Sequence, residues 1–470
     1  MNKFQRSLSL QSTTAIVVGG VIGSGIFMKP ALMASLLGSP LLLLSIWIVA
    51  GIITLFGALS NAELAAMFPE TGGQIVFFEK IYGKGFAFMY GWASFSVFNT
   101  GGNASIAWVC AQYTNYFINL PRLDAAAEHA IRLHIPYIGN IYPLENIGTK
   151  VLTIVIVALF SLLNYRSLKS SALLQRILTF IKAVAIIIVI GGLFGSGKGN
   201  WQNVLHPAVD APSGVNLLSA YVAAIAGAFW AYDGWNNITF IAGEVKQPQR
   251  TIPRSLVFGL SFCIIVYALI NLAFSYVLPI KTLASSQLVA SDALGTAWGA
   301  IGGGIIAALV IFSTLGTANA NILATARVTF AMADESRWFN WAGKVQPSYQ
   351  TPGNALLLNL AWSAVLVLSG SFDMLTDMLI FVSFFFYGMS ALGVILLRFR
   401  QPEIPRAYKV PAYPLIPAFF VLFAAFFLGY TLYNDISAYS NGRSPVINSV
   451  LGIAITAIGM LIYLFSRKTK

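Results

Sequence analysis

The chain has 470 residues, of which 57% are hydrophobic and only 9% are charged, and its formal net charge is +12. Soluble domains carry about 25% charged residues, so this composition excludes an ordinary soluble protein and predicts a chain buried largely in lipid. The excess positive charge does not indicate nucleic-acid binding, because the Lys and Arg residues are concentrated in alternate loops.

Apolar stretches long enough to cross the membrane recur along the whole chain, given that a helix needs about 20 residues to span the hydrocarbon core. We expect twelve spans, at 13–37, 41–67, 86–118, 149–164, 170–194, 215–242, 254–278, 298–332, 354–370, 374–400, 413–433 and 446–466. The sequence therefore predicts an all-α polytopic membrane protein, with residues 1–470 forming one transmembrane domain. The connecting segment 119–148 is expected to contain a short surface helix, and 279–297 a helical cap.

The positive charges indicate how these spans are oriented. Most of the 28 Lys and Arg residues fall in the two tails and in every second loop, and few, Lys29 among them, fall in the other loops. Loops rich in Lys and Arg remain in the cytoplasm. We therefore expect a multi-pass protein of the cell (inner) membrane with both termini cytoplasmic, and we call the opposite side the outer side.

The first span contains "VGGVIGSGIFMKP", residues 18–30, with four glycines in seven positions. Each glycine costs about 1 kcal/mol of helix propensity relative to alanine. Gly19 and Gly20 fit a helix-packing seam, whereas Gly23, Ser24 and Gly25 predict a break in the helix. For Gly23, Ser24 and Gly25, helix packing is the alternative interpretation.

The sixth span has a second interruption, in "GAFWAYDGWNNITFIAGE", residues 227–244, where Asp233 and Gly234 divide a long apolar run. The two broken spans start five helices apart. This spacing predicts two inverted repeats, at 1–194 (with the N-terminal tail) and 215–400, followed by two additional helices at 413–466. Discontinuous helices at corresponding positions of two halves are the best sequence indication of a transporter binding site.

Broken helices in the membrane expose polar backbone groups, which need partners. A half-helix N-terminus binds anions, and the carbonyl groups at a half-helix C-terminus bind cations. Two such breaks side by side suit an α-amino acid, which has one carboxylate and one ammonium group. No cofactor is needed for this kind of recognition.

Particular residues of the two breaks are candidates for these contacts. The amides of Ser24, Gly25 and Ile26, with the Ser24 hydroxyl, are expected to bind the carboxylate. The carbonyls expected near the ammonium group belong to Val21, Ile22, Trp230, Ala231 and Asp233. Trp230 is also a candidate gate, with packing against neighbouring helices as the alternative. The Asp233 carboxylate either attracts the ammonium group or caps the second half-helix, and capping is favoured.

Lys182 is an isolated charge well inside the fifth span, in "QRILTFIKAVAIIIVIGG". A charge at that depth needs a partner or a function. We expect its ammonium group to take the place of a sodium ion, bonded to carbonyls of the first span and to hydroxyls of the eighth. The hydroxyl candidates are Ser313, Thr314 and Thr317. The alternative is that the side chain extends to the membrane interface.

Other patterns give no sign of catalysis or of a metal site. The two cysteines, Cys110 and Cys263, lie in apolar runs and are expected to be packing residues. The three histidines lie in outer loops without metal-ligand spacing, and "GLFGSGK", residues 192–198, lacks the Ser or Thr of a nucleotide-binding loop. The spans contain no paired carboxylates or catalytic triad, so we do not expect an enzyme.

Three motifs together resemble the amino acid–polyamine–organocation superfamily, and within it the L-type amino acid transporter branch with its bacterial serine/threonine and alanine/serine/cysteine exchangers. They are "GGVIGSGIFMKP", "FWAYDGWNNITFIAGEVKQPQRTIPRSL" and "LLRFRQPEIPRAYKVPAYPLIP". The resemblance implies a LeuT-type fold and sodium-independent exchange by alternating access. It also implies that Lys182 stands where sodium-coupled relatives place an ion and that Trp230 is the gating aromatic. Tyr267 matches a tyrosine thought to couple substrate to gate, with core packing as the alternative.

The chain departs from this pattern at two places. Animal members form a disulfide with a single-span glycoprotein through the loop after the third helix, but segment 119–148 contains no cysteine, so that partner is not expected. The aromatic residue that usually follows the double glycine is replaced by Gln74-Ile75. "NAELAAMFPETGGQ", residues 61–74, otherwise resembles the first inner loop of the branch.

We therefore expect a sodium-independent exchanger of L-amino acids, neutral ones in particular. The alternative is proton-coupled uptake of amino acids or polyamines, with Lys182 changing protonation. The sequence leaves side-chain selectivity and oligomeric state open, although Asn99 and Asn103 are candidates for polar contacts with the substrate.

Overall fold

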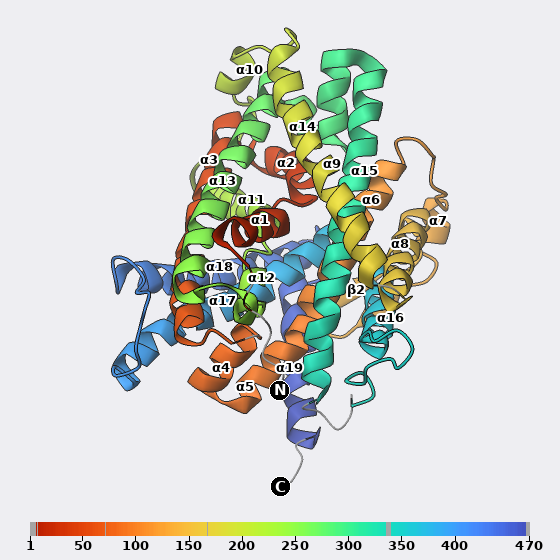
Figure 1. Ribbon diagram of the computed structural model, residues 1–470. Helices are drawn as coiled ribbons and strands as arrows, with labels where there is room; N and C mark the ends of the chain where they lie inside the picture. The colour runs from red at the N-terminus through yellow and green to blue at the C-terminus, as the bar shows by residue number, and fades with distance from the viewer. Residues whose placement is uncertain (1–5, 7, 71, 167, 335–339, 467–470) are drawn as a thin grey trace.

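The computed structural model describes residue 6 and residues 8–70, 72–166, 168–334 and 340–466, and it is almost entirely helical (Figure 1). The first half contains α1 (Leu10–Val21), α2 (Gly25–Leu37), α3 (Pro40–Met67), α4 (Gln74–Tyr82), α5 (Lys84–Ala93), the π-helix η1 (Ser94–Asn99), α6 (Thr100–Thr114), α7 (Ala125–Glu128), α8 (Ile147–Arg166), α9 (Leu168–Gly195) and α10 (Gln202–Leu205). The second half contains α11 (Gly214–Tyr232), α12 (Asn237–Phe240), the 3₁₀ helix η2 (Ala242–Glu244), α13 (Pro248–Val277), α14 (Ile280–Ser285), α15 (Val289–Asp334), α16 (Gly353–Ser369), α17 (Phe372–Arg400), α18 (Leu415–Ser440) and α19 (Asn448–Ser466).

Every stretch expected to span the membrane is helical over most of its length. By length and composition, seven helices of the described chain can cross a membrane, or eight if the bent pair α1 and α2 counts as one span. Shorter apolar helices lie at Phe180–Gly195, Asn216–Tyr232 and Gly353–Ser369. The protein is therefore a helical membrane protein, as the composition predicts.

Segment 119–148 contains the expected short helix, α7, and a feature that the all-α expectation does not include. Strands β1 (Leu133–Ile135) and β2 (Gly139–Ile141) form a small antiparallel hairpin, with Leu133 opposite Ile141. Gly139 also forms a bridge with Val446, which ties this segment to the turn before α19. The expected cap at 279–297 is helical as well, but it runs into the next helix as α15, with a kink at Gly299 (φ 74°).

Helix ends follow ordinary capping chemistry. Ser39 caps α3, with Pro40 in the first turn of the helix, and Ser371 caps α17. Gly38, in the left-handed conformation, ends α2. These caps fix where α2, α3 and α17 begin and end around the centre of the molecule.

The chain breaks at both expected places. α1 ends at Val21 and α2 begins at Gly25, with a bend of 44° between them. α11 ends at Tyr232, Asp233 is extended, and Gly234 has φ 97° before the single turn of α12. A positive φ favours glycine, so Gly234 explains why the second break occurs where it does.

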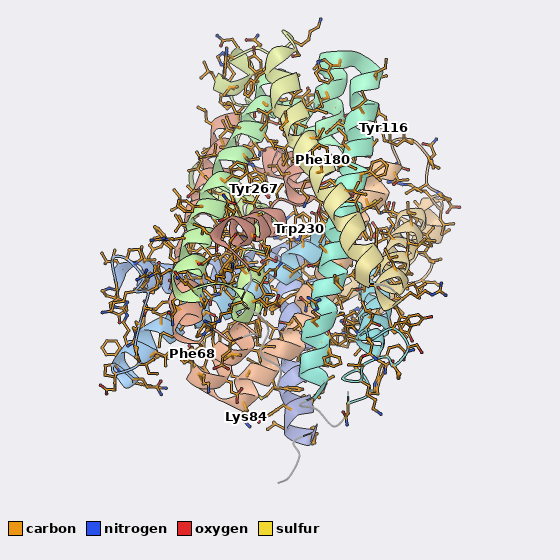
Figure 2. All side chains as sticks on the ribbon, viewed as in Figure 1. Phe68, Lys84, Tyr116, Phe180, Trp230 and Tyr267 are labelled. Atoms are coloured by element: carbon orange, nitrogen blue, oxygen red, sulfur yellow. The ribbon has the colours of Figure 1, made fainter. Side chains whose placement is uncertain are left out.

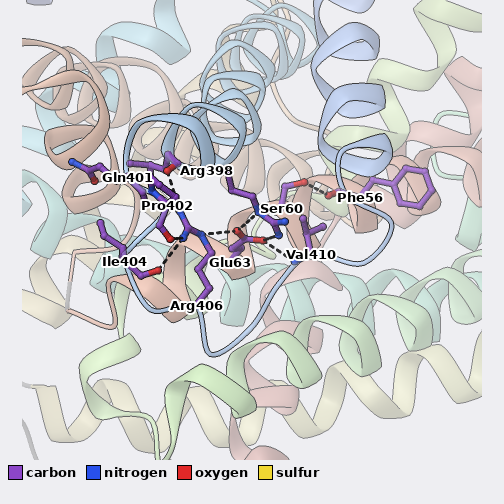
Figure 3. A network of polar contacts seen from close by, with 10 residues as sticks. Phe56, Ser60, Glu63, Arg398, Gln401, Pro402, Ile404, Arg406 and Val410 are labelled. Carbon is purple, nitrogen blue, oxygen red and sulfur yellow. Dashed lines mark hydrogen bonds and ion pairs between the residues drawn. The ribbon is translucent and has the colours of Figure 1, made fainter.

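The long helices α3 and α13 pack along one another, and α15 packs against α9 and α6 (Figure 1). On the expected inner side, a buried ion-pair network joins α3 to the end of α17 and to the loop that follows (Figure 3). The fully buried Glu63 carboxylate accepts two hydrogen bonds from Arg398, at 2.9 and 2.7 Å, and one from the Val410 amide at 2.7 Å. Arg406 Nε lies 3.5 Å from the same carboxylate. A buried carboxylate is tolerated because its oxygens have these partners.

Candidate substrate-binding site

The two breaks lie directly against each other. A Cβ atom on Gly20 would lie 3.0 Å from the Gly234 carbonyl oxygen, and one on Gly234 would lie 2.6 Å from the Gly20 carbonyl oxygen. A Cβ on Gly25 would lie 2.7 Å from Ala231. Gly20 and Gly25 therefore permit close contact between the broken spans. A Cβ on Gly19 would have no atom within 4 Å, so Gly19 does not form the expected packing seam.

A cavity of about 110 Å³ lies where the breaks meet. Trp230, one of its lining residues, lies in the central part of the molecule (Figure 2). The residues expected from sequence that line it are Val21, Gly23, Ser24, Gly25, Trp230, Ala231 and Asp233. The side chains of Ile22 and Ile26 are buried in the packed core and do not line it. Lys182 and Tyr267 contact the backbone behind it.

The N-terminus of α2 faces this cavity. Ser24 is the N-cap residue, and its hydroxyl oxygen is buried with no hydrogen-bond partner in the described structure. The first amides of a helix lack intrahelical partners and carry a partial positive charge. Ser24 and Gly25 therefore bring unpaired polar groups to the cavity, and that they bind a carboxylate remains a prediction.

The carbonyl groups that end the half-helices already have partners in this structure. The Tyr267 hydroxyl lies 2.8 Å from the Val21 carbonyl oxygen and 2.9 Å from that of Ala231, so it bridges the two broken spans. The Ile22 carbonyl accepts a hydrogen bond from Lys182 Nζ at 2.6 Å. We expect from the sequence that the Ile22 carbonyl faces the substrate, but in the structure it is turned toward Lys182.

Lys182 does not extend to the interface. Its side chain is 6% exposed, and Nζ lies 3.3 Å from the Gly19 carbonyl oxygen in addition to its bond with Ile22. The prediction of hydroxyl partners for Lys182 is wrong. Of the three hydroxyl candidates on α15, Thr314 and Thr317 donate to carbonyls of their own helix. Ser313 Oγ has no hydrogen-bond partner among the described residues.

Asp233 does not have the favoured capping role. Its carboxylate accepts a 2.6 Å hydrogen bond from the Tyr387 hydroxyl of α17, and α12 has Asn236 at its N-cap position without a side-chain cap bond. The sequence does not indicate Tyr387 as a site residue. The reason is that α17 reaches the break only through tertiary packing, which local sequence does not encode.

The outer side of the cavity is closed by a layer that we call the outer closure, formed by Lys29, Trp230, Phe372, Asp373 and Thr376. The Trp230 ring meets Phe372 edge-on at 5.1 Å. Lys29 Nζ lies 2.7 Å from Asp373 Oδ1, 2.8 Å from Thr376 Oγ1 and 5.9 Å from the centre of the Trp230 ring. Lys29 is 1% exposed, so its expected place in an outer loop is wrong.

On the opposite side the cavity continues toward α1. A second cavity of about 400 Å³ is lined by Ala15, Ile16, Gly19, Ile241, Ala320 and Ala324, and shares Gly20, Asn237, Thr317 and Asn321 with the first. The site is therefore closed on the side expected to face outward and adjoins an open vestibule on the side expected to be cytoplasmic.

Several polar side chains on the cavity lining are missed or only partly indicated by the sequence. Asn99, on the π-helix η1, lines the cavity with a buried Nδ2 that has no partner among the described residues. Asn237 and Asn321 line it as well. Asn103 does not, because it accepts a 2.8 Å hydrogen bond from Asn321 behind the lining. The π-helix is a recurrent feature of functional sites and exposes Asn99 here.

A larger cavity, of about 690 Å³, lies elsewhere in the molecule. It lies at the outer end of α6, where it is lined by Trp108 and Gln112. These residues are on a different face of α6 from Gly102 and Ile106, which line the central cavity. It is therefore not part of the same site.

Comparisons with known proteins show the family to which the chain belongs. The family model described as amino acid permease matches residues 8–466. The chain is 29% identical to the serine/threonine exchanger SteT of Bacillus subtilis, over 100% of this chain and 98% of that protein. It is 28% identical to the human b(0,+)-type amino acid transporter 1, over 90% and 82%, and 28% identical to the human cystine/glutamate transporter, over 98% and 85%.

These matches extend along nearly the whole chain, and they confirm the family resemblance that the sequence motifs carry. A buried cavity between two broken membrane helices is the kind of site that such transporters use. The chain belongs to the amino acid permease family and is a multi-pass membrane transporter of amino acids, not an enzyme.

Proposed function

We propose that this protein exchanges neutral L-amino acids across the membrane without sodium, by alternating access. One observation carries the proposal: the α2 N-terminus with Ser24, and the ends of α1 and α11 at Val21 and Ala231, line one central cavity. The amides suit a carboxylate and the carbonyls suit an ammonium group, so the pair of breaks selects an α-amino acid.

The charge of the cavity supports a neutral substrate. Among the described residues that line it, Asp233 is the one ionisable side chain, and its carboxylate is bonded to Tyr387. A cationic or anionic side chain would have no free opposite charge there. The small volume and the amides of Asn99, Asn237 and Asn321 favour small or polar side chains. The name of the Bacillus subtilis relative, a serine/threonine exchanger, points to the same class.

Lys182 supports sodium independence. Its ammonium group binds the Gly19 and Ile22 carbonyls at the end of α1, where a metal cation would otherwise be attracted. A fixed cation needs no ion gradient to occupy this position. Transport can then proceed in either direction, according to the amino-acid concentrations on the two sides of the membrane.

The transport cycle follows from the two ends of the cavity. In the described state the outer closure blocks one side of the substrate cavity, and the 400 Å³ cavity beside α1 leads to the other side. Substrate leaves through the vestibule, another amino acid binds, and the loaded protein opens the outer closure while α1 closes the inner side. Exchange requires that the loaded protein interconvert more readily than the empty one.

The architecture proposed for this cycle is the LeuT-type arrangement of the family. It comprises twelve spans, in two inverted repeats at 1–194 and 215–400 with two additional helices at 413–466, and both termini are cytoplasmic. We also propose that the chain works without a disulfide-linked partner, because segment 119–148 contains no cysteine. The two cysteines of the chain are buried and free.

Counterflow in proteoliposomes tests the proposal. Purified protein is reconstituted into vesicles loaded with unlabelled serine, and uptake of labelled serine, alanine and leucine is followed without sodium. Internal amino acid should drive uptake, and an acid-outside proton gradient should not change it. Strong uptake into empty vesicles under that gradient would instead establish the proton-coupled alternative.

A further inference from the structure

A cluster of buried polar side chains lies behind the second break, and we call it the amide cluster. Its members are Asn61 of α3, Gln74 of α4, Tyr90 of α5, Asn236 of the break and Ser390 of α17. Each of them is less than 5% exposed. None of them lines the substrate cavity, and the sequence alone assigns none of them a role, although Gln74 departs from the usual aromatic residue at its position.

Gln74 is the centre of this cluster. Its Oε1 atom accepts two hydrogen bonds, from Asn236 Nδ2 and from Tyr90 Oη, both at 2.7 Å. Its Nε2 atom donates to Ser390 Oγ at 3.0 Å. A single side chain thus connects the break to two scaffold helices. In a buried setting such connected amides hold one geometry, because a displaced member loses a partner that water does not replace.

Asn236 is fixed from the other side as well. Its Oδ1 atom accepts from Asn61 Nδ2 at 2.7 Å and from Thr239 Oγ1 at 3.1 Å. With Gln74 bonded to Nδ2, the amide has partners at both ends. Its side chain therefore has one favourable orientation, and the backbone that carries it is held with it.

The backbone next to Gln74 reinforces the same contact. The Gly72 amide donates to the Phe240 carbonyl at 3.2 Å. Gly73, with φ 53°, lies so close to α12 that a Cβ atom there would be 2.7 Å from Thr239 Oγ1. Residues 72–74 therefore support the whole turn of α12, and glycine at position 73 is what allows this approach.

Residues 233–237, which the amide cluster holds in place, contribute directly to the substrate cavity. Asp233, Gly234 and Asn237 line that cavity, and Asn236 lies between them in the chain. Gly234 is also the point at which the second break touches Gly20 of the first. A shift of the Asn236 side chain would move three lining residues and the contact between the breaks.

We propose that Gln74 is a positioning residue for amino-acid binding: through its hydrogen bond to Asn236 it fixes the unwound turn 233–236 against the scaffold. The inference rests on the proposed function, and it adds a residue outside the cavity that sets affinity for the substrate. Gln74 acts on the geometry of the site and does not contact the amino acid.

The test measures exchange kinetics in proteoliposomes for Gln74→Met, which keeps the length of the side chain and removes both polar groups. KM for the exchanged amino acid should rise about tenfold, as expected when a buried amide loses its partner, while the maximal rate per folded protein changes less than about twofold. Tyr90→Phe is the matched control. It removes the other donor to the same Gln74 oxygen but leaves Asn236 bonded, so KM should stay within about twofold.

A double-mutant comparison tests whether Gln74 acts through Asn236. Asn236→Ala should raise KM at least as much as Gln74→Met, and the double variant should have the KM of Asn236→Ala alone. If the two effects multiply instead, Gln74 acts by another route and the inference is wrong. It is equally wrong if Tyr90→Phe raises KM as much as Gln74→Met.

Two further outcomes are distinguishable. A wild-type protein that exchanges no amino acid overturns the proposed function and this inference with it, whereas wild-type exchange with an unchanged KM for Gln74→Met overturns the inference alone. Should Gln74→Met not yield folded protein, Gln74→Glu takes its place, since its carboxyl oxygen still accepts from Asn236. Its KM should then stay within about threefold of wild type, and a tenfold rise would contradict the proposal.

Discussion

Lys182 Nζ lies 2.6 Å from the carbonyl oxygen of Ile22, the C-cap residue that follows α1. The bond joins α9 to the end of α1, and the neighbouring Gly19 carbonyl lies 3.3 Å from the same nitrogen. A helix end in the membrane needs partners for its last carbonyls. Lys182 supplies them from another helix, so any movement of α1 relative to α9 must break or remake this contact.

Replacing Lys182 with Met should abolish most exchange. The change removes a charged donor from two buried carbonyls, and we expect at least about a tenfold loss of exchange rate, since such bonds are worth more than neutral ones. Counterflow of labelled serine measures the effect. The matched control is Lys198→Met, on the exposed turn after α9, which should exchange at the wild-type rate. Normal exchange by Lys182→Met would exclude the coupling role.

The contact between Gly25 and Ala231 gives a test of the carboxylate site. Gly25→Val should leave the protein inserted but abolish substrate binding, because the added side chain starts 2.7 Å from Ala231. Gly19→Ala is the control: no atom lies within 4 Å of its new Cβ, so binding should be retained. Thermal stabilisation of the purified protein by added amino acid reports binding in both variants. Persistence of that stabilisation in Gly25→Val would place the site elsewhere.

The outer closure should open when its ion pair is removed. In a background carrying Thr317→Cys, which places a thiol on the cavity lining, Lys29→Met removes the cation that lies 2.7 Å from Asp373, and a membrane-impermeant thiol reagent added from outside should then react about tenfold faster. Cys110 and Cys263 are buried, so they contribute little labelling. The exchanged pair Lys29→Asp with Asp373→Lys should restore slow labelling. Equal rates with and without Lys29 would show that the pair does not hold the closure.

We expect the Glu63 network to stabilise the folded protein and not to affect its affinity for the amino acid. Glu63→Gln weakens the contact between the fully buried Glu63 carboxylate and Arg398, whose side chain is 20% exposed. We expect the variant to lose about 3 kcal/mol of unfolding free energy. A lower unfolding temperature in detergent measures it. The exposed Glu70 provides the control variant Glu70→Gln, which should unfold like wild type. An altered KM for Glu63→Gln with unchanged stability would contradict this assignment.

The local features of the site are predictable from sequence because they have local causes. Glycines in a membrane helix and an Asp-Gly pair inside an apolar run interrupt helices by their own conformational preferences. Lys182 stands out because an isolated charge in lipid is expensive. These signals place both breaks and the amine that joins α9 to α1.

The remaining parts depend on which helices meet, and that information is not local. The charge pattern counts Lys29 with the outer loops, yet the first turns of α17 bury it. A capping role is the natural interpretation of Asp233 because its partner, Tyr387, lies 154 residues away. The hydroxyls of α15 are expected to bind Lys182, but rotation of a helix about its axis is set by packing and not by sequence spacing.

The position of the Tyr267 hydroxyl, between the carbonyl oxygens of Val21 and Ala231, has a consequence for the unloaded protein. A phenol carries one proton and donates one hydrogen bond at a time, so at each moment one of the two acceptors goes without this donor. An ammonium group brings three donors. In the protein without substrate, one of these two carbonyl oxygens therefore always lacks the Tyr267 donor, and the ammonium group of a bound amino acid would supply the missing hydrogen bond.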